Sequence, residues 1–124
     1  MQLPDRLSDL ARQAIGGAED DASERGSDSF NAGHLLMAML RIPECIGFRI
    51  LAAKGSNPAV LRVRLDERLP RIPARAGTAS RPSKPIEMAI AQAADEAKSF
   101  GHTMIGTEHL LLAVLASGDG AAFR

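Results

Sequence analysis

Apolar residues recur every three or four positions along two long segments of the chain, which is the spacing of one helix face. The first segment covers about residues 5–25 and stops at Gly26, and the second covers about 83–100 and stops at Gly101. A glycine directly after a helix favours its termination. The residues expected to face inward are Leu7, Leu10, Ala14, Ala18 and Ala22 in the first helix, and Ile86, Ala89, Ile90, Ala93 and Ala97 in the second.

Two shorter segments, about residues 32–41 and 107–117, are apolar nearly all the way round. Such segments predict helices at the centre of a domain. Each is followed by a turn, containing Pro43 in one case and Gly118 and Gly120 in the other, and then by the start of a third helix. Asn57 and Pro58 predict the cap and first residue of a fourth helix, with four residues facing inward: Val60, Leu61, Leu65 and Leu69.

The chain contains an internal repeat. A shift of 75 positions aligns residues 6–49 with 81–124 and matches fifteen identical residues in those 44 positions. The repeat predicts two copies of one helical unit. We expect them to pack about a pseudo-twofold axis, because each copy alone has too little core to be stable. We expect one all-α domain over residues 1–124, with a first repeat at 6–69 and an incomplete second repeat at 81–124.

Residues 70–82 connect the two repeats. The stretch 70–85 that contains them has four prolines and no acidic residue, and it predicts an extended, solvated chain. The second repeat stops at Arg124, so it lacks the counterpart of residues 50–69. We expect either a frayed carboxyl end or another molecule in the space of the absent helices.

Composition supports this picture and limits the partners. The chain has no tryptophan or tyrosine, only four phenylalanines and many alanines, which favours helix. Fifteen basic and fifteen acidic residues cancel, so no overall field would attract nucleic acid or an anionic membrane. One cysteine, no signal-peptide pattern and no apolar segment of eighteen residues indicate a cytoplasmic protein.

The segment "MIGTEHLLLAVL", residues 104–115, carries the candidate chemistry of the chain. Thr107 is predicted to cap the helix that follows, and Glu108 lies where the helix dipole favours a negative charge. A structural role explains both residues. The same place could instead hold a guanidinium against the carboxylate while free first-turn amides receive a phosphate.

Two histidines occupy matching positions in the two copies. His34 and His109 are predicted to be structural, each with its ring at a helix start and hydrogen-bonded to the backbone. His102 is expected at the surface, and Cys45 lacks a histidine placed to make it a nucleophile. No metal-ligand set, phosphate-binding loop or catalytic triad is present in the sequence. We therefore expect no enzymatic activity, no metal and no cofactor.

The doubled unit, the phrase "GHTMIGTEHLLLAVL" and the following "GDGAAFR" resemble the amino-terminal repeat domain of Clp-type AAA+ unfoldases, most closely of the ClpC kind. The resemblance implies the Clp N-domain fold and a docking module. Its partners would be protein substrates or adaptors and the Clp ATPase and peptidase assembly. The first copy departs from the family pattern, with Asn31, Ala32 and Gly33 where the family usually has Gly, Thr and Glu.

In the ClpC kind, the glutamate of each such phrase is associated with recognition of arginine-phosphorylated substrates. The resemblance assigns that role to Glu108, with Thr107 beside it, and it cannot assign it to Gly33. A two-site binder would be reduced to one site, or the second site would have changed its ligand. Two alternatives stay open: an accessory that packs on Clp rings without reading substrates, and a small helical DNA-binding regulator, against which the zero net charge argues.

Overall fold

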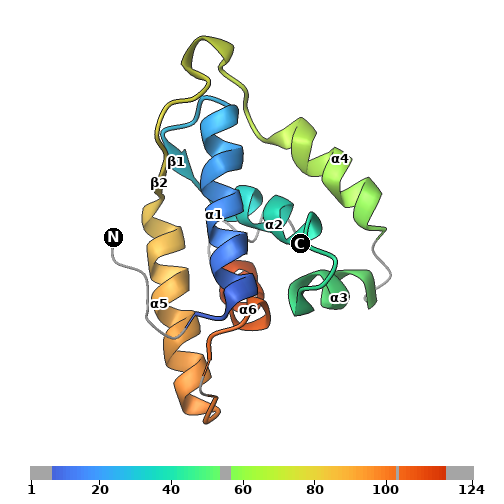
Figure 1. Cartoon of the computed structure of the whole chain (residues 1–124), viewed down its shortest axis with the longest axis vertical. Coiled ribbons are helices and arrows are strands. Elements are labelled where there is room, and N and C mark those ends of the chain that lie inside the picture. Colours follow the sequence, from blue (N-terminus) through green and yellow to red (C-terminus); the bar gives the residue numbers. More distant parts are fainter. Residues whose placement is uncertain (1–6, 54–56, 103, 117–124) are drawn as a thin grey trace.

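A computed structural model describes residues 7–53, 57–102 and 104–116 of the chain (Figure 1). Within these residues it contains, in order, α1 (Asp9–Glu24), β1 (Ser29–Phe30), α2 (Ala32–Leu40), α3 (Ile46–Ala53), α4 (Pro58–Arg68), the 3-10 helix η1 (Pro73–Arg75), β2 (Arg81–Pro82), α5 (Lys84–Ser99) and α6 (Thr107–Ala116). The predicted helical fold class is confirmed. None of the helices in the described part of the chain has the length and apolar character needed to cross a bilayer.

The two long helices α1 and α5 begin and end in the same way. Ser8 Oγ accepts the Ala11 N–H at 3.1 Å, and Ser83 Oγ accepts the Ile86 N–H at 3.3 Å. At their carboxyl ends, Gly26 and Gly101 have φ values of +82° and +73°. Glycine adopts this left-handed conformation at little cost, which explains both stops. The residues predicted to face inward are buried except Leu10, which is only partly buried. Leu7 is buried but lies before α1, which begins later than predicted.

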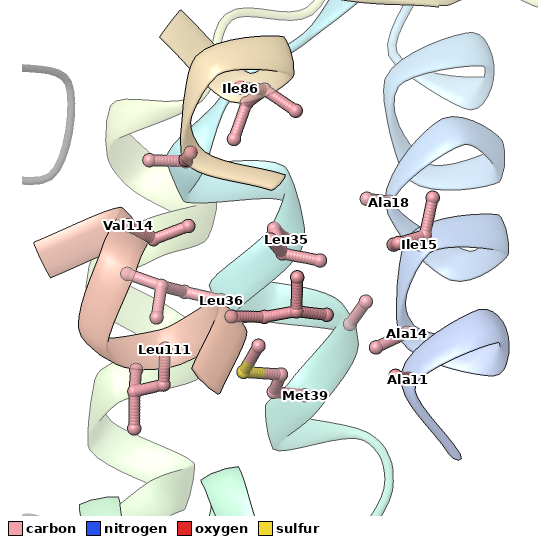
Figure 2. Close-up of a cluster of buried hydrophobic side chains, with 14 of the residues drawn as sticks. Ala11, Ala14, Ile15, Ala18, Leu35, Leu36, Met39, Ile86, Leu111 and Val114 are labelled. Atoms are coloured by element: carbon pink, nitrogen blue, oxygen red, sulfur yellow. The ribbon is translucent and has the colours of Figure 1, made fainter. Parts of the chain in front are cut away.

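Helix α2 lies at the centre of the domain, with all nine of its residues buried. Its side chains Leu36 and Met39 lie between the alanine face of α1 and the residues Leu111 and Val114 of α6 (Figure 2). The approach of α1 to α2 is close, because a Cβ atom on Gly17 would lie 3.1 Å from Ala38 Cβ. The small residues of α1 therefore allow the leucines and methionines of α2 to fill the core.

Two apolar side chains that were expected inside are exposed. Val60, on α4, is 46% exposed, because only Leu65 on that helix is buried and α4 lies at the periphery (Figure 1). Leu112, on α6, is 54% exposed, whereas its counterpart Met37 in α2 is buried. Met37 lies beside the residues of α4, and no helix in the described part of the chain covers Leu112 in the same way. The predicted turn at Gly118 and Gly120, the third helix of the second copy and its carboxyl end lie outside the described residues.

Backbone pairing joins the two halves reciprocally. Strand β1 is parallel to β2, and Leu7 forms an isolated parallel bridge with Ile105. The Ser83 N–H donates to Phe30 O and the Ser8 N–H donates to Ile105 O, both at 2.9 Å. The shift of 75 positions converts one of these bonds into the other. Each half therefore pairs the residues before its long helix with the residues before the short helix of the other half.

The connector between the repeats is more ordered than the extended chain that was predicted. It contains η1 and β2, and it is bonded to the end of α1. The Ile72 N–H donates to Arg25 O at 2.7 Å, and the Gly77 N–H donates to Ser23 O at 2.8 Å. The final carbonyls of a helix have no partner within the helix, so the connector satisfies part of the end of α1.

A buried arginine ties α1 to α4. Arg25 is 1% exposed; its Nε lies 2.9 Å from Asp21 Oδ2 and its Nη2 lies 2.7 Å from Asp66 Oδ1. Burial alone would lower the pKa of Arg25, but its hydrogen bonds to Asp21 and Asp66 outweigh burial and raise it. Asp66 has a lowered pKa because it accepts hydrogen bonds from Arg25 and then from Arg71. The guanidinium stays charged, and its loss would leave Asp21 buried without its closest partner.

We expect Arg25→Met to lower the free energy of unfolding by about 3 kcal/mol, the typical cost of removing one partner of a buried ion pair. Urea unfolding followed by circular dichroism would measure it. Arg71→Met is the matched control, because it removes an exposed arginine from the same Asp66 and should change stability little. Equal losses in the two variants would contradict a structural role for the buried arginine.

Candidate functional site

The amino end of α6 is open. The helix begins at Thr107, directly after Gly106, which has no side chain to cap the first turn. No described residue accepts a hydrogen bond from the amides of Thr107, Glu108 or His109. The Glu108 side chain folds back over Gly106, where any side chain at position 106 would overlap its carboxylate. The Glu108 side chain is 26% exposed, and its negative charge lies beside amides that donate to no described residue.

A shallow hollow of about 460 Å³ lies beside this helix start. Its lining residues are Gly101, His102, Met104, Glu108 and His109. Met104 is exposed and gives the hollow an apolar wall. The hollow can hold a cation against the Glu108 carboxylate, and the amides of the first turn of α6 can receive an anion.

Thr107 does not cap its own helix, so that prediction is wrong. It is the first residue of α6, it is buried, and its Oγ1 accepts the Gly47 N–H at 2.8 Å from the first turn of α3. The α6 backbone carries the side chain toward α3, and the amide at the start of α3 needs an acceptor. Thr107 therefore joins the two halves through a buried hydrogen bond.

The rings of His34 and His109 both lie at helix starts, with the predicted hydrogen bonds to backbone. His34 Nδ1 accepts the Asn31 N–H at 3.0 Å, and His109 Nδ1 accepts the Gly106 N–H at 2.9 Å. In each case the ring replaces the glutamate or glutamine that usually completes a capping box. Since Nδ1 accepts, the hydrogen of the neutral ring is on Nε2.

His102, expected only as a surface residue, is exposed but takes part in the site. Its Nδ1 lies 2.7 Å from His109 Nε2, so the His109 Nε2–H donates to it. Glu108 Oε1 lies 3.3 Å from His109 Nδ1, but this contact is no ion pair while Nδ1 accepts the Gly106 N–H. The spacing of seven residues between the two histidines gave no sequence signal, because a loop and not one helix connects them.

The matching helix start in the first half is closed. Asn31 Oδ1 accepts the Gly33 N–H at 2.9 Å and the His34 N–H at 3.3 Å. Gly33 itself is buried and has no side chain. The first turn of α2 therefore offers neither a carboxylate nor its free amides to a ligand.

Another hollow and a buried cysteine in the described part of the chain are further candidates for a site. A hollow of about 500 Å³ between α2 and α4 is lined by residues of mixed charge and by exposed Val63. Cys45 is buried before α3, where its Sγ accepts the Phe48 N–H at 3.3 Å, so its sulfur has a structural position. No group of three or more His, Cys, Asp or Glu among the described residues is placed to hold a metal ion.

We expect Thr107→Val to cost about 1–3 kcal/mol of stability, because it leaves the buried Gly47 N–H without an acceptor. Urea unfolding would measure the loss, and hydrogen exchange would show faster exchange of the Gly47 amide. Thr107→Ser keeps the hydroxyl and is the control. If the valine variant were as stable as the serine variant, the bond from Gly47 would contribute nothing.

The stability of the domain should fall in acid partly through His34. Burial lowers the pKa of His34 below 6.5; the Arg25 charge adds to the effect and the Asp21 charge opposes it. A group whose pKa is lower in the folded state contributes stability above its unfolded pKa, and this is lost as pH falls through the folded value. His34→Gln keeps an acceptor for the Asn31 N–H but removes this titration. Between about pH 7 and about pH 5, the free energy of unfolding should therefore fall more steeply for the wild type than for His34→Gln. Equal slopes for the two proteins would contradict the prediction.

The sequence of the chain matches a known protein family. The family model of the Clp repeat (R) N-terminal domain matches residues 6–124. The chain is 28% identical over 122 residues to the negative regulator of genetic competence ClpC/MecB of Bacillus subtilis (strain 168), covering 96% of this chain and 15% of that protein. It is 23% identical over 125 residues to the chaperone protein ClpB of Oceanobacillus iheyensis, again covering 96% and 15%. The chain thus spans about a seventh of the length of these relatives.

Solved structures share the fold. The Hsp104 N-terminal domain from Candida albicans matches with a TM-score of 0.80 and 15% identity, covering 96% of this chain and 79% of that chain. A complex of the ClpV N-domain with a VipB peptide matches with a TM-score of 0.79 and 17% identity, covering 93% and 72%. By its family match over nearly its whole length, the chain belongs to the Clp repeat N-terminal domain family.

Proposed function

We propose that this chain is a protein-binding module of a Clp protease system, which docks substrates or adaptor proteins for an AAA+ unfoldase. Membership of the Clp repeat N-terminal domain family supports this role. A ClpV N-domain of the same fold has been solved in complex with a VipB peptide, which supports a protein ligand. The balanced charge of the chain gives no comparable support to nucleic acid.

The observation that carries the proposal is the open start of α6. The Glu108 carboxylate lies over Gly106, beside first-turn amides whose N–H groups donate to no described residue. A guanidinium next to a phosphoryl group places a positive and a negative charge one bond apart. The carboxylate binds the guanidinium and the amides bind the phosphoryl oxygens, so an arginine-phosphorylated segment fits both parts of the site.

Of the two related helix starts, only that of α6 has both a carboxylate and amides that donate to no described residue. At the start of α2, Asn31 Oδ1 already accepts from the amides of Gly33 and His34. A phosphoryl group would have to displace the Asn31 side chain from these amides. Because Gly33 has no carboxylate, no ion pair with the guanidinium would offset that loss. The proposed stoichiometry is one phosphoarginine for each chain.

Calorimetric titration of a peptide with a single phosphoarginine tests the proposal. We expect one site for the wild type and binding that is about tenfold or more weaker for Glu108→Gln and Glu108→Ala, since each removes the carboxylate charge that pairs with the guanidinium. The loss should be selective for the phosphorylated peptide over the same peptide with unmodified arginine.

Glu87→Gln is the matched control. Glu87 is an exposed carboxylate in the first turn of α5, where Ser83 already caps the helix. This variant should bind as the wild type does. Equal affinity of the wild type and Glu108→Ala would remove Glu108 from the site and contradict the proposal.

A further inference from the structure

We infer that His102 and His109 form a proton-operated switch that engages the Glu108 carboxylate when the pair takes up one proton. In acid, binding at the start of α6 would therefore weaken. The inference rests on the proposed role of Glu108 in ligand binding, and it adds regulation of that site by pH.

The hydrogen positions in the neutral pair follow from the geometry. His109 Nδ1 accepts the Gly106 N–H, so the only ring hydrogen of His109 is on Nε2. That hydrogen lies in the 2.7 Å contact with His102 Nδ1, which accepts it. Glu108 Oε1, at 3.3 Å, then faces a lone pair on His109 Nδ1 and makes no bond with it. The carboxylate is available to a ligand.

One added proton can reside on either ring while the 2.7 Å contact persists. If it is on His109, that ring carries hydrogens on both nitrogens. If it is on His102, the His102 Nδ1–H must donate to His109 Nε2, and neutral His109 must carry its hydrogen on Nδ1 instead. In both states His109 Nδ1 becomes a donor, so the Gly106 N–H loses its acceptor and the new donor faces Glu108 Oε1.

The consequence for a ligand is direct. A guanidinium binds poorly to a carboxylate that is already bonded to a cationic histidine pair. The pair occupies the carboxylate with its own N–H donor, and its positive charge repels the guanidinium. The titratable residues that line the hollow are His102, Glu108 and His109. None of the charged residues on the helices packed against α6 is among its lining residues. They are Asp9, Arg12, Glu19, Asp20, Asp21 and Glu24 of α1, Arg49 of α3, and Lys84, Glu87, Asp95, Glu96 and Lys98 of α5.

The first half of the chain lacks the same device. The shift of 75 positions places Ser27 where the second half has His102, and Gly33 where it has Glu108. His34 Nε2, the counterpart of the nitrogen that meets His102, is buried and has no hydrogen-bond partner within the described residues. Proton uptake at His34 therefore has no second ring and no counterpart of Glu108 to act on, and Ser27 suggests the substitution that removes the second ring.

Nitrogen-15 NMR of the histidine rings tests the switch without a ligand. Between about pH 8 and about pH 5, the range in which histidine titrates, we expect His109 Nδ1 to gain hydrogen in step with protonation of the pair. The protection factor of the Gly106 amide, which corrects for the slower intrinsic exchange in acid, should fall over the same interval. If His102 takes up the proton alone while His109 Nδ1 stays unprotonated, the inference is overturned.

Binding provides the second test, with the phosphoarginine peptide as the probe. Wild type and His102→Ser are titrated at about pH 7.5 and about pH 5.5, and mass spectrometry confirms that the acid-labile phosphorus–nitrogen bond stays intact. The wild type should lose about tenfold more affinity on acidification than the variant. Titration of the peptide itself affects both proteins equally and cancels.

The outcomes separate the two proposals. If the peptide binds at the higher pH and both proteins lose the same affinity in acid, the switch is wrong and the site remains. If the peptide does not bind even at the higher pH, the proposed ligand is wrong, and the ring NMR alone decides whether the hydrogen on His109 moves.

Discussion

Two backbone hydrogen bonds hold the frame on which the rest depends: Ser8 N–H to Ile105 O and Ser83 N–H to Phe30 O. Both bonds pass between the halves. Each donor is the serine that caps a long helix, α1 or α5. Each acceptor, Ile105 or Phe30, lies two positions before the short helix of the other half, α6 or α2. The residues before α2 and α6 are therefore held by the other half of the chain as well as by their own local hydrogen bonds. Backbone amides and carbonyls make the bonds, so side chains beside them can change while the frame persists.

That freedom explains how the two helix starts come to differ. The first is closed by the Asn31 side chain, which accepts from two amides. The second has Gly106 in the same position, and the unoccupied space is filled by the Glu108 carboxylate. Both keep a histidine whose Nδ1 accepts from the backbone. The common histidine maintains the helix start, and the residues around it decide whether that start can bind anything.

Features set by neighbours along the chain could be predicted from the sequence. Glycine stops and the Asn57–Pro58 helix start are local, and the structure has each at its expected place. Features that depend on what lies across the fold could not. Thr107 looked like a cap, but its hydroxyl accepts from an amide sixty residues away. The burial of Arg25 and the contact of His102 with His109 likewise arise only when separate segments meet. The exposure of Leu112 depends on whether a helix covers it, which its own apolar pattern does not reveal.

The central claim is that the two related helix starts have one frame but only the second is open to a ligand. Backbone amide NMR during titration with a phosphoarginine peptide measures this most directly, because both starts are observed in one experiment. The account predicts shifts at Gly106, Glu108 and His109 that saturate together, while Gly33 and His34 stay unchanged. Shifts centred on Gly33 and His34, or on the hollow between α2 and α4, would contradict it.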